Sequence, residues 1–254
     1  MSLRFSAAVA SLVLASCAAG AQDVDGFAAR SFKGANGVPM LYRLFIPSVE
    51  PRKKALPLVV YLHGSGGIGD DNLKQISGGS YMGTHVWTTP DAQRRHPAYV
   101  LAPQLPPGEQ WGAPGSDALS SHAETLVQLI AALTQEFSLD PDRVYLTGQS
   151  LGGRGTWDII SKRPDLFAAA VPLCGDGNLS RVAAARKLAI WVFHGAQDLL
   201  VPVTGSRDLV AALRAVGSPV KYTEYPNSGH DVWRRAYVDP GLADWLFGQR
   251  RAIR

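Results

Sequence analysis

The stretch from Val144 to Gly153 (VYLTGQSLGG) constrains this chain more than any other. An apolar run of strand-forming residues leads into the pattern Gly-x-Ser-x-Gly, and a stretch of helical character follows until Pro164. A serine on so tight a strand-to-helix turn has a strained backbone, so its neighbours two positions away must lack bulk. Gly148 and Gly152 meet this need, which predicts that Ser150 stands exposed at a helix N-terminus. The alternative is an ordinary turn in a glycine-rich chain.

Apolar runs of strand length alternate with stretches of helical character along the chain. Most runs are continuous, as in strands buried on both faces of a parallel sheet, whereas the first alternates loosely and predicts an antiparallel strand. They lie at 40–46, 58–62, 99–102, 144–148, 168–173, 188–193 and 220–225, with helices predicted at 118–137, 154–163, 206–215 and 241–247 and a turn at 140–142. This order predicts an α/β fold with a mostly parallel central sheet and helices on both faces. The chain has 254 residues, 46% of them hydrophobic, which suits one domain over residues 25–254.

The first residues predict an export signal. An apolar, alanine-rich run follows Arg4 and is too short to span a bilayer. Ala19-Gly20-Ala21 fits the small-x-small rule for a signal peptide of residues 1–21. The alternative is a lipobox at Leu14-Ala15-Ser16-Cys17, which predicts cleavage before Cys17 and a lipid anchor there. We therefore expect an exported protein, either periplasmic or secreted. If the lipobox is used, we expect an outer-membrane lipoprotein.

Cysteine content and charge limit the expected cofactors and partners. Cys17 and Cys174 are the two cysteines, so we expect no disulfide within the domain and predict a buried Cys174. No zinc or iron–sulfur spacing occurs, which predicts chemistry without a metal or cofactor. The net charge of +4 comes from scattered basic residues and does not predict nucleic-acid binding. Membrane contact is expected only through a lipid on Cys17.

Ser150, Asp198 and His230 each follow a predicted strand, in the order nucleophile, acid and base. Serine needs an adjacent base to act as a nucleophile, and the base needs an orienting acid. Because parallel strands bring their carboxyl ends to one edge of the sheet, we predict that the three form a catalytic triad. Asp176 remains an alternative acid. The other histidines are expected to be structural or exposed: His194 and His63 are structural, and His85, His96 and His122 are exposed.

The glycine-rich segment His63-Gly64-Ser65-Gly66-Gly67 follows an earlier buried strand. A tetrahedral intermediate of acyl transfer needs N–H donors for its oxyanion, and one should be the N–H of Leu151, next to the nucleophile. The second is predicted to be the N–H of Ser65, with Gly66 as the alternative. A glycine-rich turn without a ligand is the competing interpretation.

Together these segments resemble secreted α/β-hydrolase esterases related to feruloyl esterases, polyhydroxybutyrate depolymerases and dienelactone hydrolase. The resemblance rests on residues 58–71, 102–104, 142–157, 192–202 and 228–233. It implies an α/β-hydrolase fold and hydrolysis of carboxylic esters through an acyl-enzyme. The chain departs from dienelactone hydrolase by having Ser150 where that enzyme uses a cysteine. It also lacks the propeller domain of prolyl oligopeptidases, which makes a peptidase-like hydrolase a weaker alternative.

Substrate choice has less support in the sequence. Trp111 and Trp233 fall on loops near the predicted site, where they would either contact an acyl or aryl group or belong to the core. No long lid insertion precedes Asp198, so we predict an open site for short-acyl, aryl (feruloyl-like) or acetyl-sugar esters, small or linked to a polysaccharide. The alternatives are an extracellular polyester depolymerase and a catalytically silent surface lipoprotein.

Overall fold

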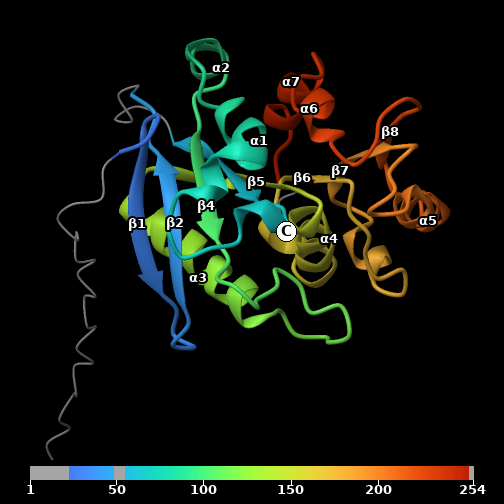
Figure 1. Ribbon diagram of the computed structural model, residues 1–254, viewed down its shortest axis with the longest axis horizontal. Coiled ribbons are helices and arrows are strands. Elements are labelled where there is room, and N and C mark those ends of the chain that lie inside the picture. The colour runs from blue at the N-terminus through green and yellow to red at the C-terminus, as the bar shows by residue number, and fades with distance from the viewer. Residues whose placement is uncertain (1–22, 49–54, 252–254) are drawn as a thin grey trace, which may run out of the picture.

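One eight-stranded sheet forms the centre of the molecule (Figure 1). The computed structural model describes residues 23–48 and 55–251, so the predicted signal peptide and Cys17 lie outside the described residues. The strands, in chain order, are β1 (Phe27–Lys33), β2 (Pro39–Phe45), β3 (Leu56–Leu62), β4 (Tyr99–Gln104), β5 (Leu139–Gln149), β6 (Ala169–Leu173), β7 (Ala189–Gly195) and β8 (Lys221–Tyr225). Across the sheet they are ordered β1-β2-β4-β3-β5-β6-β7-β8.

The sheet is mostly parallel, as predicted. β2 pairs antiparallel with β1 and with β4, and all pairs from β4 to β8 are parallel. In β3, Leu58 and Leu62 belong to the core on one face, whereas Tyr61 belongs to the core on the other. Successive side chains of a strand point to opposite faces, so a strand between two cores must be apolar throughout.

Helices cover both faces of the sheet, which confirms the predicted α/β-hydrolase architecture. Side chains of α3 (Ser121–Glu136), α4 (Leu151–Lys162) and α5 (Val203–Ala215) fill one core. The opposite core contains residues of α6 (Trp233–Ala236) and α7 (Leu242–Phe247), with the short helices α1 (Tyr81–His85) and α2 (Pro90–Arg95) preceding β4. Between β6 and β7 the described chain holds only a 3₁₀ turn at Val182–Ala185, so no large lid covers this region. Within the described residues no helix combines the length and apolar character needed to cross a membrane.

Two strands of the sheet differ from the sequence prediction. The turn predicted at 140–142 belongs to the start of β5, because Leu139 already pairs with Leu56 and a register shift follows before Val144 pairs with Leu58. This irregularity lets a strand continue through a proline, which cannot donate to the ladder. Strand β1 was not predicted. Most of its residues are half-buried at the sheet edge, so its apolar periodicity is weak.

Candidate active site

Ser150 lies between the end of β5 and the start of α4, on a strained turn. Its backbone dihedrals are φ 55° and ψ −117°, a conformation that L-residues rarely adopt. A Cβ on Gly148 would overlap the carbonyl of Gly152, and a Cβ on Gly152 would overlap that of Leu62. These contacts confirm that the turn needs glycine at both positions. The packing around this turn therefore places Ser150 at the carboxyl edge of the sheet, beside a cavity that it lines.

The structure brings the three predicted triad residues together. His230 Nε2 lies 2.8 Å from Ser150 Oγ, and His230 Nδ1 lies 2.7 Å from Asp198 Oδ2. The carboxylate can only accept, so Nδ1 carries the hydrogen and Nε2 is left to accept from the serine hydroxyl. The alternative acid Asp176 instead pairs with Arg154. The arrangement can move a proton from Ser150 to His230 while Asp198 fixes the ring tautomer.

Asp198 is buried and held by several donors. Its Oδ1 accepts the N–H groups of Leu200 and Val201, each at 2.9 Å. Burial alone would raise the pKa of Asp198, but these N–H groups and the His230 ring hold that pKa below its ordinary value. The carboxylate is therefore ionised at neutral pH and can stabilise a protonated His230.

A second histidine, His194, contacts the same carboxylate. Its Nε2 lies 3.2 Å from Asp198 Oδ2 and 3.0 Å from the Val201 carbonyl, and both partners are acceptors, so Nε2 carries the hydrogen. Burial lowers the pKa of His194, which makes the neutral ring the expected form. Its Nδ1 lies 2.8 Å from Ser206 Oγ, whose single hydrogen is also within reach of the Gly175 carbonyl at 3.1 Å. His194 is structural in the sense predicted, and it touches the candidate site through Asp198.

The loop after β3 is fixed by the buried His63. The Leu105 N–H donates to His63 Nε2 at 3.0 Å, so Nδ1 carries the hydrogen and donates to the Gly64 carbonyl at 2.6 Å. Burial lowers the pKa of His63 from 6.5 to about 4. The predicted role of His63 in shaping the loop is thereby confirmed.

The candidate oxyanion donors lie at the starts of two helical turns. The 3₁₀ turn Ser65–Gly67 uses the Gly67 N–H to bond the Gly64 carbonyl at 3.0 Å. The first N–H groups of a helical turn have no acceptor within it, which applies to Ser65 and Gly66 here and to Leu151 at the start of α4. All three residues line the cavity beside Ser150, and their role as donors stays a prediction.

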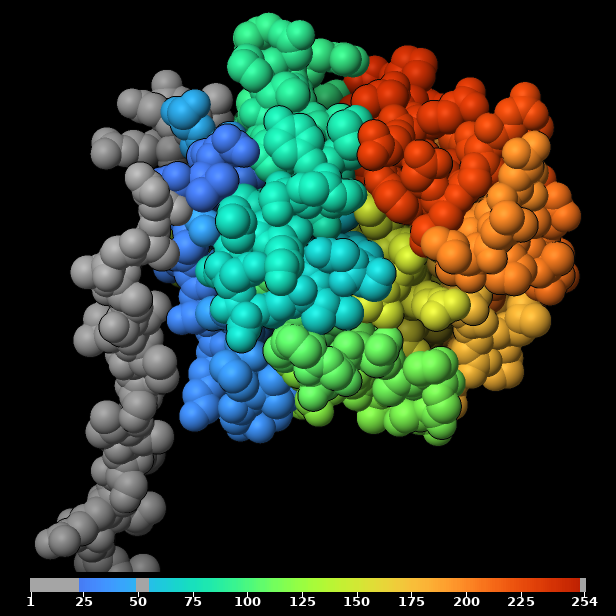
Figure 2. Space-filling view, viewed as in Figure 1, coloured from blue at the N-terminus to red at the C-terminus, as the bar shows by residue number. Residues whose placement is uncertain are grey.

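A cavity of about 460 Å³ opens beside Ser150 and His230. On the face drawn in Figure 2, the cyan segment after β3, the green segment after β4 and the red C-terminal segment surround the yellow region that contains α4. Trp233 lines this cavity, and its ring meets the His230 ring edge-on with centroids 5.5 Å apart. The sequence prediction that Trp233 contacts substrate stays a prediction, but its position allows it.

For Trp111 the predicted substrate contact is wrong, and the alternative of a core residue is confirmed. Its side chain is 0% exposed, its ring packs against His63 at 5.1 Å, and its Nε1 donates to the His63 carbonyl at 3.1 Å. The loop after β4 folds back so that this buried tryptophan packs against the loop after β3, where a substrate cannot reach it. The predicted exposure is also wrong for His85 and His122, which are both buried.

Sequence reasoning did not single out Arg154 or Leu200, yet both line the cavity. Arg154 lies four positions after Ser150 on α4, so helical spacing was the available signal. Leu200 has no such signal beyond its closeness to Asp198 in sequence.

Cys174 is buried as predicted, and its sulfur lies with side-chain atoms of Asp198 and His230 within 4.8 Å. Three such ligand types in one place can hold a metal ion in principle. Burial raises the pKa of the Cys174 thiol, however, and metals bind the thiolate. Because Asp198 and His230 are already committed to each other, the donor set fits a proton relay better than a metal centre.

The parallel sheet, the strained serine turn and the Ser–His–Asp geometry at one sheet edge define an α/β-hydrolase. The sequence pattern of the dienelactone hydrolase family matches residues 48–237. The chain belongs to the dienelactone hydrolase family.

Relatives and solved structures extend this assignment. Poly(3-hydroxyalkanoate) depolymerase C of Paucimonas lemoignei is 33% identical over 138 residues, a match that covers 51% of this chain and 30% of that protein. A bifunctional acetylxylan esterase/xylanase of Neocallimastix patriciarum is 29% identical over 143 residues, covering 56% of this chain and 19% of that protein. The crystal structure of a thermostable esterase superposes with a TM-score of 0.85 at 39% identity, covering 89% of this chain and 64% of that one. The chain thus spans less than a third of these two curated relatives and less than two thirds of the solved esterase.

Proposed function

We propose that this protein is a serine esterase that hydrolyses carboxylic esters through an acyl-enzyme. The observation that carries the proposal is the unbroken path from Ser150 Oγ through His230 to Asp198, with separations of 2.8 and 2.7 Å. Three-residue relays of this geometry activate serine for attack on acyl groups.

In this mechanism Ser150 Oγ attacks the ester carbonyl carbon while His230 Nε2 takes the hydroxyl proton. The N–H groups of Leu151 and of Ser65 or Gly66 stabilise the oxyanion, an interaction typically worth a few kcal/mol per donor. The tetrahedral intermediate collapses, the alcohol leaves with the proton from His230, and the acyl group stays on Ser150. A water molecule then gives a proton to His230 and attacks the acyl carbon. The second tetrahedral intermediate collapses, His230 returns this proton to Ser150 Oγ, and the acid is released.

Short-acyl, aryl and acetyl-sugar esters are the proposed substrates, because the described chain has no lid over the cavity. Initial rates on p-nitrophenyl esters from acetate to palmitate and on methyl ferulate test the proposal, with Ser150→Ala as the matched variant. We expect turnover of the short or feruloyl esters to be lost in the variant. Unchanged activity in Ser150→Ala would show that this serine is not the nucleophile. If the wild-type protein neither hydrolyses these esters nor reacts with a serine-reactive phosphonate, a catalytically silent binding protein is favoured.

One observation favours a second candidate, a depolymerase of extracellular polyester. Leu199 and Leu200 directly follow the triad acid and are 94% and 73% exposed, and Leu200 lines the cavity. Exposed apolar side chains beside a catalytic cavity suit adhesion to an apolar polymer. Replacing both leucines by serine should reduce binding to poly(3-hydroxybutyrate) granules while leaving the melting temperature intact. Equal binding by the wild type and the double variant excludes this role for the two leucines.

Export remains a proposal that rests on residues 1–21. Mass analysis of the mature N-terminus distinguishes its two forms: a lipidated Cys17 supports the anchored form, and a chain beginning at Gln22 supports ordinary cleavage.

A further inference from the structure

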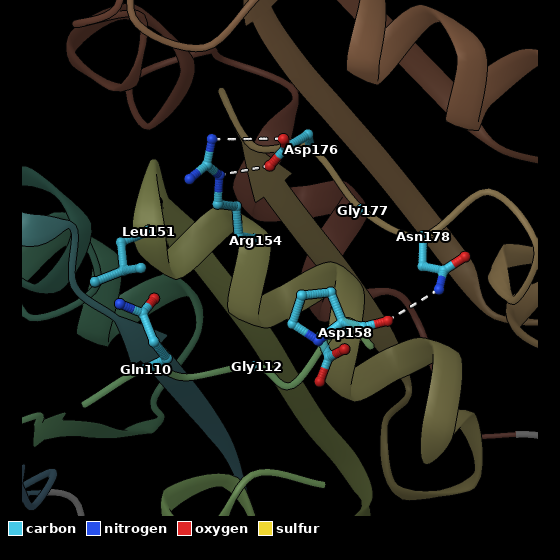
Figure 3. Close-up of a pocket in the computed structure, with 9 residues that line it drawn as sticks. Gln110, Gly112, Leu151, Arg154, Asp158, Asp176, Gly177 and Asn178 are labelled. Atoms are coloured by element: carbon cyan, nitrogen blue, oxygen red, sulfur yellow. Dashed lines mark hydrogen bonds and ion pairs between the residues drawn. The ribbon is translucent and has the colours of Figure 1, made fainter. Parts of the chain in front are cut away.

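A second pocket of about 390 Å³ adjoins the candidate active site. Leu151 and Arg154 line both this pocket and the cavity beside Ser150, so the two spaces meet over the first turn of α4. Asp158 of α4 also lines the pocket. The other walls come from the loop after β4 and the loop after β6 (Figure 3), with the lining residues Gln110, Gly112, Pro114, Asp176, Gly177 and Asn178. The volume lies within the roughly 300–1,000 Å³ range of small-molecule sites.

The floor of this pocket is held by a buried ion pair. Lys162 Nζ and the Ala113 N–H both donate to Asp158 Oδ2, at 2.8 and 3.0 Å, and Lys162 also donates to the Ala113 carbonyl. The side chains of Asp158 and Lys162 are only 7% and 4% exposed. These bonds fix the loop after β4 against α4, so the pocket is a built feature of the fold.

The pocket offers both hydrogen-bond donors and hydrogen-bond acceptors to a ligand. Among the described residues every donor to Asp158 contacts Oδ2, which leaves its Oδ1 to accept from a group in the pocket. Arg154 Nε lies 2.5 Å from Asp176 Oδ1, and this half-exposed pair keeps further N–H and carboxylate positions facing outward. Figure 3 shows this pair on one side of the pocket and Asn178 on another.

The charges of the pocket cancel in pairs. Arg154 is matched by Asp176, and Lys162 is matched by Asp158. A carboxylate or an ammonium group entering the pocket would therefore meet as much repulsion as attraction. A neutral group rich in hydroxyls has no such conflict, because each hydroxyl both donates and accepts.

We propose that the pocket formed by Arg154, Asp176 and Asp158 is a subsite for a neutral saccharide ring that carries the scissile ester. The inference rests on the proposed esterase activity and names acylated sugars as the substrate class. The ester would lie over Ser150, and the unacylated hydroxyls would bond the side chains of the pocket across Leu151.

Paired substrates with the same acyl group test the subsite. Methyl O-acetyl-β-xyloside offers ring hydroxyls, whereas cyclohexyl acetate has a ring of similar size without them. We expect Arg154→Ala and Asp176→Ala each to lower the ratio of kcat/KM for the xyloside to kcat/KM for cyclohexyl acetate by about tenfold, mainly through KM. Comparing each variant with the wild type cancels the difference in intrinsic reactivity of the two esters.

The matched control is Arg207→Ala. Arg207 is half-exposed and paired with Glu224, as Arg154 is with Asp176, but it lines neither cavity. This variant should keep the wild-type ratio. A ratio that stays unchanged in both pocket variants overturns the subsite alone. If the wild-type protein hydrolyses none of the xyloside, cyclohexyl acetate and p-nitrophenyl acetate, the proposed function is overturned, and the subsite with it.

Discussion

Asp198 joins two Ser–His–Asp arrangements of similar dimensions. On one side His230 lies 2.7 Å from the carboxylate and 2.8 Å from Ser150 Oγ; on the other His194 lies 3.2 Å from it and 2.8 Å from Ser206 Oγ. The His194 side chain is 0% exposed and Ser206 is buried within α5, whereas His230 is 16% exposed and Ser150 lines a cavity. Hydrogen-bond geometry alone therefore does not distinguish the proposed nucleophile Ser150 from Ser206. Access and the strained turn at Ser150 separate the two.

The largest expected effect is at His230, on the side of Asp198 that faces the cavity. Replacing His230 by alanine removes the proposed base, and losses of about 10⁴-fold or more in kcat are typical for members of a serine triad. Combining His230→Ala with Ser150→Ala should add little, because the two residues act as a unit. Rates on p-nitrophenyl acetate for both single variants and the double variant measure this. Full additivity of the two losses would contradict a shared proton path.

His63 extends the comparison to a histidine that touches neither serine. Its pKa falls from 6.5 to about 4 on burial, so the unfolded chain binds a proton that the folded chain excludes. The free energy of unfolding is therefore unaffected by His63 above about pH 6.5. Below that it falls, by about 3 kcal/mol in all, as the pH approaches about 4. Urea unfolding across this range should show a shallower acid loss in His63→Gln than in the wild type. Parallel curves would mean that the pKa of His63 is the same in the folded and the unfolded chain, which would contradict this prediction.

Much of the fold could be predicted because its signals are local. The buried strands are continuous apolar runs, and glycines flank Ser150 because the turn itself excludes larger residues. The positions of Asp198 and His230 followed from strand ends, since parallel strands deliver their carboxyl ends to one edge. Their proximity to Ser150 is what the structure shows, and their catalytic role stays a prediction.

The misplaced Trp111 and the unforeseen pocket beside α4 share one physical cause, which is contact between segments distant in sequence. Trp111 lies in a loop that reads as exposed, and only its packing on His63 explains its burial. The pocket beside α4 requires the loops after β4 and β6 to meet, with Asn178 donating to the Pro114 carbonyl at 3.0 Å. No periodicity or motif within either loop encodes such a meeting.

The smallest expected effect is at His194, on the fully buried side of Asp198. Replacing His194 by phenylalanine removes the Nε2 donor to the carboxylate and leaves Asp198 less firmly placed, which should lower kcat by about tenfold to a hundredfold with little change in KM. Glutamine can present an N–H near the position of Nε2, so His194→Gln should recover most of the rate. Melting temperatures recorded for both variants separate positioning from general destabilisation, because glutamine rescue of kcat without rescue of stability points to Asp198. A loss in His194→Phe as large as that in His230→Ala would erase the distinction between the two histidines, since the sealed one would then be needed for the chemistry as much as the open one.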